Sequence, residues 1–260
     1  MDSSEKIKRI FGHRVPHYQR DFPIILFWSP RSGCTSFVKW FFFQIGLLDK
    51  ALQYNPWVHY YELEVYKRKP NYLQNLILEI MQSEKEIYKL VRNPYRRAVS
   101  SFIMFTGNPI IWGDLTTKMK QHFYNDKNSK EGFSFKQFLQ YLKTNGADVY
   151  SMDPHFSQQY VGGEERYVNK YIYLENFNNN IRELENKYGL VPAPLDQLSQ
   201  SSHHFNSKMI HTGNYANVRT TDPSFPNFPT FESFYDEETK MLVEEVFKKD
   251  FETYLYNKSF

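Results

Sequence analysis

Residues 22–37 read FPIILFWSPRSGCTSF, and they contain an abrupt change from apolar to small and polar residues. The apolar run 24–28 is typical of a strand that is buried on both faces of a parallel sheet. A turn over residues 29–36 follows, and then an apolar stretch, 37–48, that we read as a buried helix. A strand, a tight turn and a helix N-terminus together direct free backbone N–H groups and the positive end of the helix dipole at one spot. This stretch therefore predicts an anion site.

Residues 88–102, YKLVRNPYRRAVSSF, repeat the change from strand to helix. The pattern predicts a strand over 87–91 and a helix with Pro94 in its first turn, where proline is well tolerated. Arg92 stands at the hinge, and Ser100 follows two helical turns later. Two such sites on neighbouring strands suit a ligand that carries two separate phosphates.

Together the two segments resemble the sulfotransferases that use 3′-phosphoadenosine-5′-phosphosulfate (PAPS). The first family motif is a strand that ends in a loop of the Pro-Lys/Arg-Ser/Ala-Gly-Thr-Thr type, matched by residues 30–35. The second motif is an Arg-Asp-Pro followed by an Arg and a Ser, matched by Arg92, Pro94, Arg97 and Ser100. The resemblance implies that the loop cradles the 5′-phosphosulfate and that Arg92 and Ser100 bind the 3′-phosphate. The implied donor-binding residues are Arg31, Ser32, Gly33, Cys34, Thr35, Ser36, Arg92 and Ser100.

Two positions depart from the family pattern. Cys34 stands where threonine or serine is common, and Asn93 replaces the usual aspartate. No Cys-His arrangement is evident in the sequence, so Cys34 is read as a donor contact or a small packing residue rather than a nucleophile. The loss of the aspartate charge puts the local geometry around Asn93 in question, and we expect Arg97 to serve an internal ion pair or the helix surface.

The resemblance also implies catalytic roles. Arg31 occupies the Lys/Arg position of the family and would stabilise the charge that grows on the bridging oxygen. A general base must accept the proton of the acceptor hydroxyl. His59 is the first candidate for this base, because many family members carry a histidine or an acid between the two motifs, near the end of the second strand. Glu62 is the alternative carboxylate, and a plain core histidine is the competing interpretation of His59.

A second candidate histidine lies in the segment 153–159, DPHFSQQ. It resembles the Asp-Pro-His-Trp-x-Pro-Gln segment of membrane carbohydrate sulfotransferases, which suggests an acceptor-side role for His155 and Gln159. The stretch 203–208, HHFNSK, is similar to a later segment of the same group. We read its histidines as loop residues near the donor, and we expect no metal site. The sequence leaves His59 and His155 both open as the base.

Bulk properties fit a small anionic ligand. The chain has 260 residues, 18% of them aromatic, and a net charge of only +3, so charge alone does not indicate a nucleic-acid partner. A single cysteine excludes an internal disulfide and a Cys-based zinc site. The N-terminus shows no secretory signal, and no run of about 18 apolar residues occurs. If complete, the chain is expected to be cytoplasmic; nothing indicates its oligomeric state.

The expected fold is α/β, a P-loop-containing three-layer domain with a central parallel sheet of about five strands flanked by helices. One domain over residues 1–260 is the economical interpretation, with 1–21 as an irregular arm and 108–132 as a mobile flap. Further strands are expected at 57–61 and 167–174. Helices are expected at 73–81, 133–142, 176–188, with Gly189 as the C-cap, and 237–249.

The expected activity is in-line transfer of a sulfuryl group from PAPS to a hydroxyl or amine, releasing adenosine 3′,5′-bisphosphate without a metal. Positioning and charge stabilisation would supply most of the rate. A carbohydrate or glycoconjugate is the expected acceptor, with a phenol or lipid alcohol open. Two alternatives stay open: a non-catalytic module that senses the bisphosphate, and a small-molecule kinase. The loop does not match the Walker pattern, since Ser29 replaces its first glycine and no lysine follows Gly33.

Overall fold

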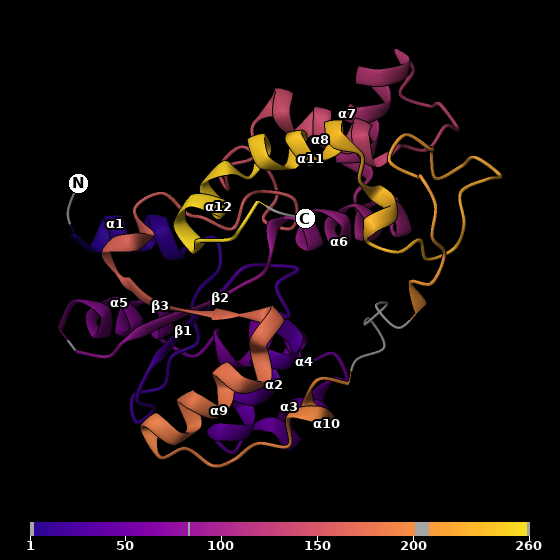
Figure 1. Cartoon of the computed structure of the whole chain (residues 1–260). Helices are drawn as coiled ribbons and strands as arrows, with labels where there is room; N and C mark the ends of the chain where they lie inside the picture. Colours follow the sequence, from indigo (N-terminus) through magenta and orange to yellow (C-terminus); the bar gives the residue numbers. More distant parts are fainter. Residues whose placement is uncertain (1–2, 83, 201–207, 259–260) are drawn as a thin grey trace. The chain divides into compact units, whose positions relative to one another are not determined.

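A computed structural model describes residues 3–82, 84–200 and 208–258 (Figure 1). The chain divides into two compact units. The first comprises Met1–Arg92 and Val161–Ser202, and the second comprises Asn93–Tyr160 and His203–Phe260. Each unit is described by itself. The expectation of one domain over residues 1–260 stays a prediction.

The first unit is an α/β structure with a parallel sheet flanked by helices. Its strands are β1 (Ile25–Trp28), β2 (Ile87–Val91) and β3 (Val168–Tyr173), in the order β1-β2-β3. Ile87 pairs with Ile25 on one side and with Val168 on the other, and both pairings are parallel. The α/β class and three of the expected strand segments are confirmed. Over the residues described, the sheet has three strands rather than about five.

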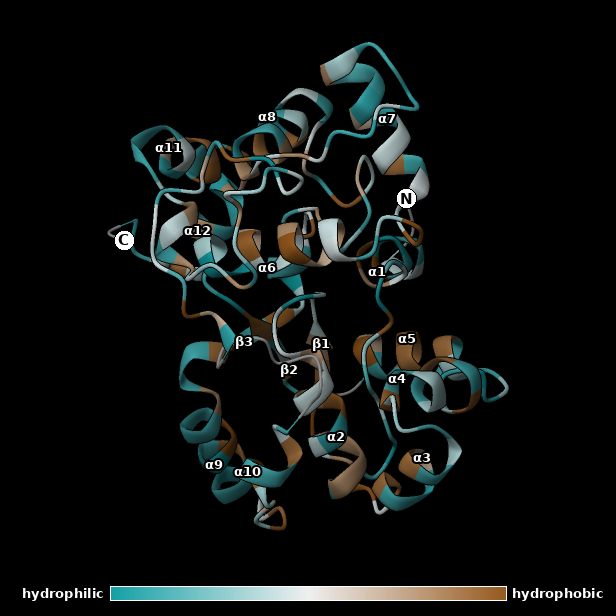
Figure 2. Cartoon of the chain, turned by 90° about the vertical axis from the view of Figure 1, so that its right-hand side faces the viewer, coloured by the Kyte–Doolittle hydropathy of each residue, from teal (hydrophilic) through white to brown (hydrophobic). Residues whose placement is uncertain are grey.

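Helices surround this sheet in the first unit. The hydrophobic core of this unit contains aromatic residues of α2 (Cys34–Gln44) packed with residues of β1. Phe37, Trp40 and Phe41 of α2 are fully buried there. Figure 2 colours α9 largely teal, and this helix buries only a few of its residues. The helices are α1 (Ser3–Phe11), α2 (Cys34–Gln44), α3 (Leu48–Tyr54), α4 (Val58–Tyr61), the π-helix η1 (Glu62–Tyr66), α5 (Tyr72–Gln82), η2 (Glu164–Arg166), η3 (Leu174–Asn176), α9 (Phe177–Tyr188) and α10 (Leu195–Leu198).

The second unit is helical over its described residues. Its core is a cluster of phenylalanines around α6, among them Phe102, Phe135 and Phe234. Within the described ranges, no helix is both long and apolar enough to cross a membrane. The helices are α6 (Pro94–Gly107), α7 (Gly113–Tyr124), α8 (Phe135–Asn145), η5 (Glu232–Phe234), α11 (Glu237–Val246) and α12 (Lys248–Tyr254).

Three segments differ from the sequence-based expectation. The strand expected at 57–61 is wrong: Val58–Tyr61 form α4, and the Asn55 side chain accepts the N–H of Trp57, its N-cap residue. The expected irregular arm contains α1, whose apolar face is buried at Ile7, Ile10 and Phe11. The expected flap at 108–132 contains α7, held by one fully buried side chain, Met119.

A buried ion pair lies in the middle of β2. The Lys89 ammonium lies 2.5 Å from a Glu164 carboxylate oxygen, and neither side chain is exposed. The same carboxylate accepts the Val161 N–H, and the ammonium lies 4.6 Å from the centroid of the Phe27 ring. Such a pair is costly to break, because removing one partner leaves the other charge buried and uncompensated.

We therefore expect Glu164→Ala to lower the free energy of unfolding by about 3–5 kcal/mol. Urea denaturation followed by circular dichroism measures this change. The exposed neighbour Glu165 supplies the control, since Glu165→Ala should cost less than about 1 kcal/mol. Equal losses in the two variants would show that Lys89 does not depend on its buried partner.

Candidate functional site

The loop between β1 and α2 has the conformation that the sequence predicted for an anion site. Arg31 and Gly33 both adopt a positive φ, of 68° and 89°. A Cβ on Gly33 would lie 2.4 Å from the Leu174 Cδ1 atom, so both the backbone angle and the close packing require glycine. The Ser32 hydroxyl donates to the Ser29 carbonyl and lies 3.4 Å from the Leu90 carbonyl, which ties the loop to β2.

The N-terminus of α2 is available to an anion. Gly33 is the N-cap residue and no side chain caps the helix. The N–H groups of the first turn, which includes Cys34, Thr35 and Ser36, have no carbonyl partner within the helix. An oxyanion placed there would accept these N–H groups and would interact favourably with the helix dipole.

Arg92 joins the second motif to this loop. It follows β2 directly, is 8% exposed, and its guanidinium donates to the Arg31 carbonyl over 3.1 Å. Burial lowers the pKa of Arg31 from its ordinary value, but an arginine stays cationic in a protein. The structure therefore brings together Arg31, Ser32, Gly33, Cys34, Thr35, Ser36 and Arg92 at the carboxyl ends of β1 and β2, the edge where ligands bind in parallel sheets.

Ser100 and Arg97 lie on α6 and belong to the second unit. The helix is capped by Asn93, whose side chain accepts the N–H groups of Tyr95 and Arg96. Asparagine thus performs the capping that an aspartate would perform in its place. Ser100 is 8% exposed. Arg97 is buried and donates to the backbone carbonyls of residues 157 and 154, at 2.6 and 3.0 Å.

His155 lies in the loop that Arg97 holds. Its Nδ1 atom is 2.8 Å from an Asp153 carboxylate oxygen, and the Ser101 hydroxyl donates to its backbone carbonyl. Gln159 is 1% exposed and its side-chain amide faces Asp250 at 3.4 Å, so it is embedded in the second unit. The segment 203–208 was expected near the donor. Its residues 203–207 lie outside the described residues, and only Lys208 is described.

His59 lies at the loop between β1 and α2, on α4 rather than at the end of a strand. Its Nε2 atom is 3.3 Å from the Thr35 hydroxyl, and its Nδ1 atom is 2.5 Å from a Glu62 carboxylate oxygen. Since α4 continues into the π-helix η1, His59 and Glu62 are one turn apart and face each other. The other Glu62 oxygen lies 2.5 Å from the Lys67 ammonium and 3.1 Å from Nε2 of His17.

This network sets the charges at the site. Burial favours the neutral form of Glu62, but Lys67 and the two histidines outweigh it and hold its pKa well below its usual range. Burial lowers the pKa of His17 to about 4, so His17 is neutral at neutral pH. Burial also opposes the charged form of His59, yet Cys34 and Glu62 raise its pKa to about 9. Glu62, with both oxygens engaged, serves to hold His59 and is a poor proton acceptor.

Cys34 and His59 form a pair that sequence reasoning missed. The two side chains are close enough for each to shift the pKa of the other, so a Cys-His arrangement does exist at the loop. Burial alone would raise the pKa of the Cys34 thiol, but the charges of His59 and Arg14 outweigh burial and lower it. No spacing in the sequence signals this pair, because residues 34 and 59 meet only through tertiary packing. Over the described residues, no group of three His, Cys, Asp or Glu side chains could hold a metal ion.

Comparison with known proteins gives one match. A family model described as the sulfotransferase family matches residues 19–257, which is most of the chain. Neither the curated proteins nor the solved structures contain a match to this chain.

The pair of Cys34 and His59 predicts a reactive thiol. We expect the half-maximal rate of alkylation by iodoacetamide to occur at a lower pH in the folded protein than in urea, because His59 stabilises the thiolate. Mass spectrometry measures the rate of alkylation from about pH 5 to about pH 10. The signal comes from one thiol, because Cys34 is the single cysteine.

His59→Ala provides the matched control for this measurement. It removes the cation and leaves the burial, so the midpoint should move to higher pH. A midpoint in the folded protein at or above the value in urea would contradict the assignment.

Proposed function

Because this chain belongs to the sulfotransferase family, we propose that it transfers a sulfuryl group from PAPS to a hydroxyl or amine of a carbohydrate-type acceptor. Family membership supports sulfuryl transfer in general; the donor, the acceptor and the residue roles are our proposal. The observation that carries it is the bond from Arg92 to the Arg31 carbonyl, which unites the two motifs. This bond supports the proposal of a P-loop type of donor site.

Residues of the loop and of β2 would share the donor. The first-turn N–H groups of α2 and the Thr35 and Ser36 hydroxyls would hold the 5′-phosphosulfate. Arg31 would stabilise the charge that develops on the bridging oxygen when its bond to sulfur breaks. Arg92, together with Ser100 of α6, would hold the 3′-phosphate. The fit is one of charge and hydrogen-bond donors, which a bisphosphorylated ligand requires.

His59 would accept the proton of the acceptor. As the acceptor oxygen forms its bond to sulfur, its proton would pass to the imidazole, while the bisphosphate leaves with the electrons of the broken bond. The contact with Thr35 supports this role, because it places the imidazole within 3.3 Å of the donor loop. His155 remains the proposed acceptor-side residue, since its loop carries the resemblance to carbohydrate sulfotransferases.

The donor assignment predicts which nucleotide binds. Calorimetric titration without added metal should show tighter binding of adenosine 3′,5′-bisphosphate than of ADP, which lacks the 3′-phosphate. Arg92→Ala should weaken bisphosphate binding by about tenfold or more, equal to about 1.4 kcal/mol, and leave ADP binding almost unchanged. The exposed Arg68 provides a matched control, because Arg68→Ala removes the same charge from the surface.

Equal binding of the two nucleotides by the unaltered protein would contradict the proposed donor. It would favour the non-catalytic or the kinase alternative, which magnesium-dependent turnover of ATP distinguishes. Arg31→Ala should chiefly lower turnover with PAPS, because its charge acts on the leaving oxygen.

The base assignment predicts the pH dependence of sulfuryl transfer. A histidine must be neutral to accept a proton, and the pKa of His59 is raised to about 9, so kcat/KM should rise with pH and level off near that value. Glu62→Gln removes the charge that favours the imidazolium. The midpoint should therefore move to lower pH, with a lower maximum because His59 loses its orientation.

Two controls keep this test interpretable. Glu64→Gln neutralises an exposed carboxylate of the same π-helix and should leave the midpoint unchanged. Retained bisphosphate affinity shows that each variant is folded. A profile that does not rise with pH, or a midpoint that Glu62→Gln does not move, would remove His59 from the role of base.

A further inference from the structure

The segment of residues 14–18, here called the strap, is fixed against the first unit through its backbone. His17 exchanges two hydrogen bonds with Leu26 of β1, at 2.8 and 3.0 Å. The Lys67 ammonium donates to the carbonyl of Val15, and the Tyr72 hydroxyl donates to the carbonyl of Pro16. The strap is therefore held in place by bonds within the chain itself.

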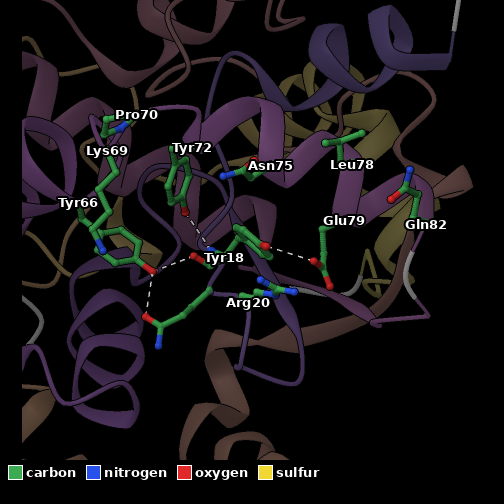
Figure 3. Close-up of a pocket in the computed structure, with 11 residues that line it drawn as sticks. Tyr18, Arg20, Tyr66, Lys69, Pro70, Tyr72, Asn75, Leu78, Glu79 and Gln82 are labelled. Atoms are coloured by element: carbon green, nitrogen blue, oxygen red, sulfur yellow. Dashed lines mark hydrogen bonds between the residues drawn. The ribbon is translucent and has the colours of Figure 1, made fainter.

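Tyr18, at the far end of the strap, lines a groove of about 570 Å³ (Figure 3). There the Tyr66 hydroxyl donates to the carbonyl of Tyr18, the Tyr72 hydroxyl accepts the Tyr18 N–H, and the Tyr18 hydroxyl donates to Glu79. The hydroxyls of Tyr18, Tyr66 and Tyr72 thus all form hydrogen bonds with other residues of the chain. The lining residues thus hold one end of the strap, and Arg14 lies at its other end.

Arg14 lies beside Trp28, the last residue of β1 before the donor loop. Its guanidinium carbon is 4.5 Å from the centroid of the Trp28 ring, a cation–π contact. The ring of His59 lies 5.5 Å from the same indole, and the ring of His17 stacks on it at 6.2 Å. Arg14 and the proposed base thus share Trp28 as a neighbour, and the charge of Arg14 also acts on Cys34 of the loop.

Two hydrogen-bond donors at this place have no partner. The Arg14 Nε and the Trp28 Nε1 atoms are both buried, and neither bonds to any other part of the chain within the described residues. Trp28 is only 2% exposed. More than nine in ten buried polar groups in proteins have a partner, so two orphan donors on contacting side chains call for a ligand oxygen.

The charges around these donors favour an anion. Arg14, Lys67 and the protonated His59 face the Glu62 carboxylate and the Cys34 thiol, whose pKa the charge of Arg14 helps to lower. His17, on the strap, is neutral at neutral pH. Positive charge exceeds negative charge here even when Cys34 is ionised. A buried surplus of one sign is costly unless a counter-charge binds.

We propose that Arg14 and the Trp28 indole N–H form an oxyanion subsite beside His59, additional to the first turn of α2 and to Arg92. Its ligand is a sulfate-, phosphate- or carboxylate-type group. The inference rests on the proposed function, which offers two sources of such a group: an acidic substituent of the acceptor, or the sulfuryl group in transfer. In either case Arg14 fixes an oxyanion next to the base.

The test titrates inorganic sulfate into the bisphosphate-saturated protein and follows the indole N–H signals by ¹⁵N–¹H NMR. Trp28→Phe assigns the Trp28 signal among the four tryptophans. We expect a saturable shift of this signal and a loss of sulfate affinity of about tenfold or more in Arg14→Met. Arg20→Met is the matched control, because it removes the same charge from an exposed position six residues further along the chain.

Further arms distinguish the two sources. If the sulfuryl group is the ligand, Arg14→Met weakens binding of PAPS more than binding of the bisphosphate. If the acceptor supplies the anion, Arg14→Met raises KM for an acidic acceptor and leaves KM for a neutral one unchanged. Arg14→Lys should retain part of the sulfate affinity, which separates loss of charge from loss of structure.

The proposed subsite would be wrong if the Trp28 signal did not shift when sulfate is added. It would also be wrong if Arg14→Met and Arg20→Met bound sulfate with equal affinity. Failure of the proposed function has a different signature, namely that the unaltered protein does not bind the bisphosphate. Sulfate titrated into the protein alone then still reports on Trp28 and Arg14.

Discussion

The proposed catalytic site depends on the ion pairs of one buried carboxylate, that of Glu62. It contacts His59, His17 and Lys67. Water cannot take the place of these partners, because the Glu62 side chain has no exposed surface. Through Lys67 and His17 it also holds the strap against β1. One charge therefore joins α4, η1 and the N-terminal segment, and it fixes the imidazole that faces the loop after β1. A π-helix at this point is in keeping with the frequent occurrence of π-turns at functional sites.

The two halves of the proposed donor site differ in how they are built. The loop after β1 depends on backbone conformation, with positive φ at Arg31 and Gly33 and a helix N-terminus without a cap. The second motif depends on side chains: Arg92 reaches back to the loop, and Asn93 caps the helix that follows. Backbone N–H groups suit a group whose oxygens must be oriented, and arginine suits a phosphate that must be held.

The sequence was sufficient for the parts of the structure that local pattern determines. The run 24–28, Pro94 and Gly189 each have a direct local meaning, and the strand, the helix start and the C-cap are where they were expected. The expectation of a strand at 57–61 was wrong, because aromatic and branched residues occur in both strands and short buried helices. The pairs of Cys34 with His59 and of Arg14 with Trp28 unite distant segments, and no spacing indicates them.

The bond between Arg92 and residue 31 ends on a main-chain oxygen, which every amino acid possesses. The link between the two motifs is therefore indifferent to the side chain at position 31. A lysine in place of arginine there would change the side chain at position 31 without uncoupling the loop from the second strand. Position 92 has no such freedom, since its own side chain makes the connection. The tolerance of these two arginines to replacement should thus be unequal, although both carry the same charge.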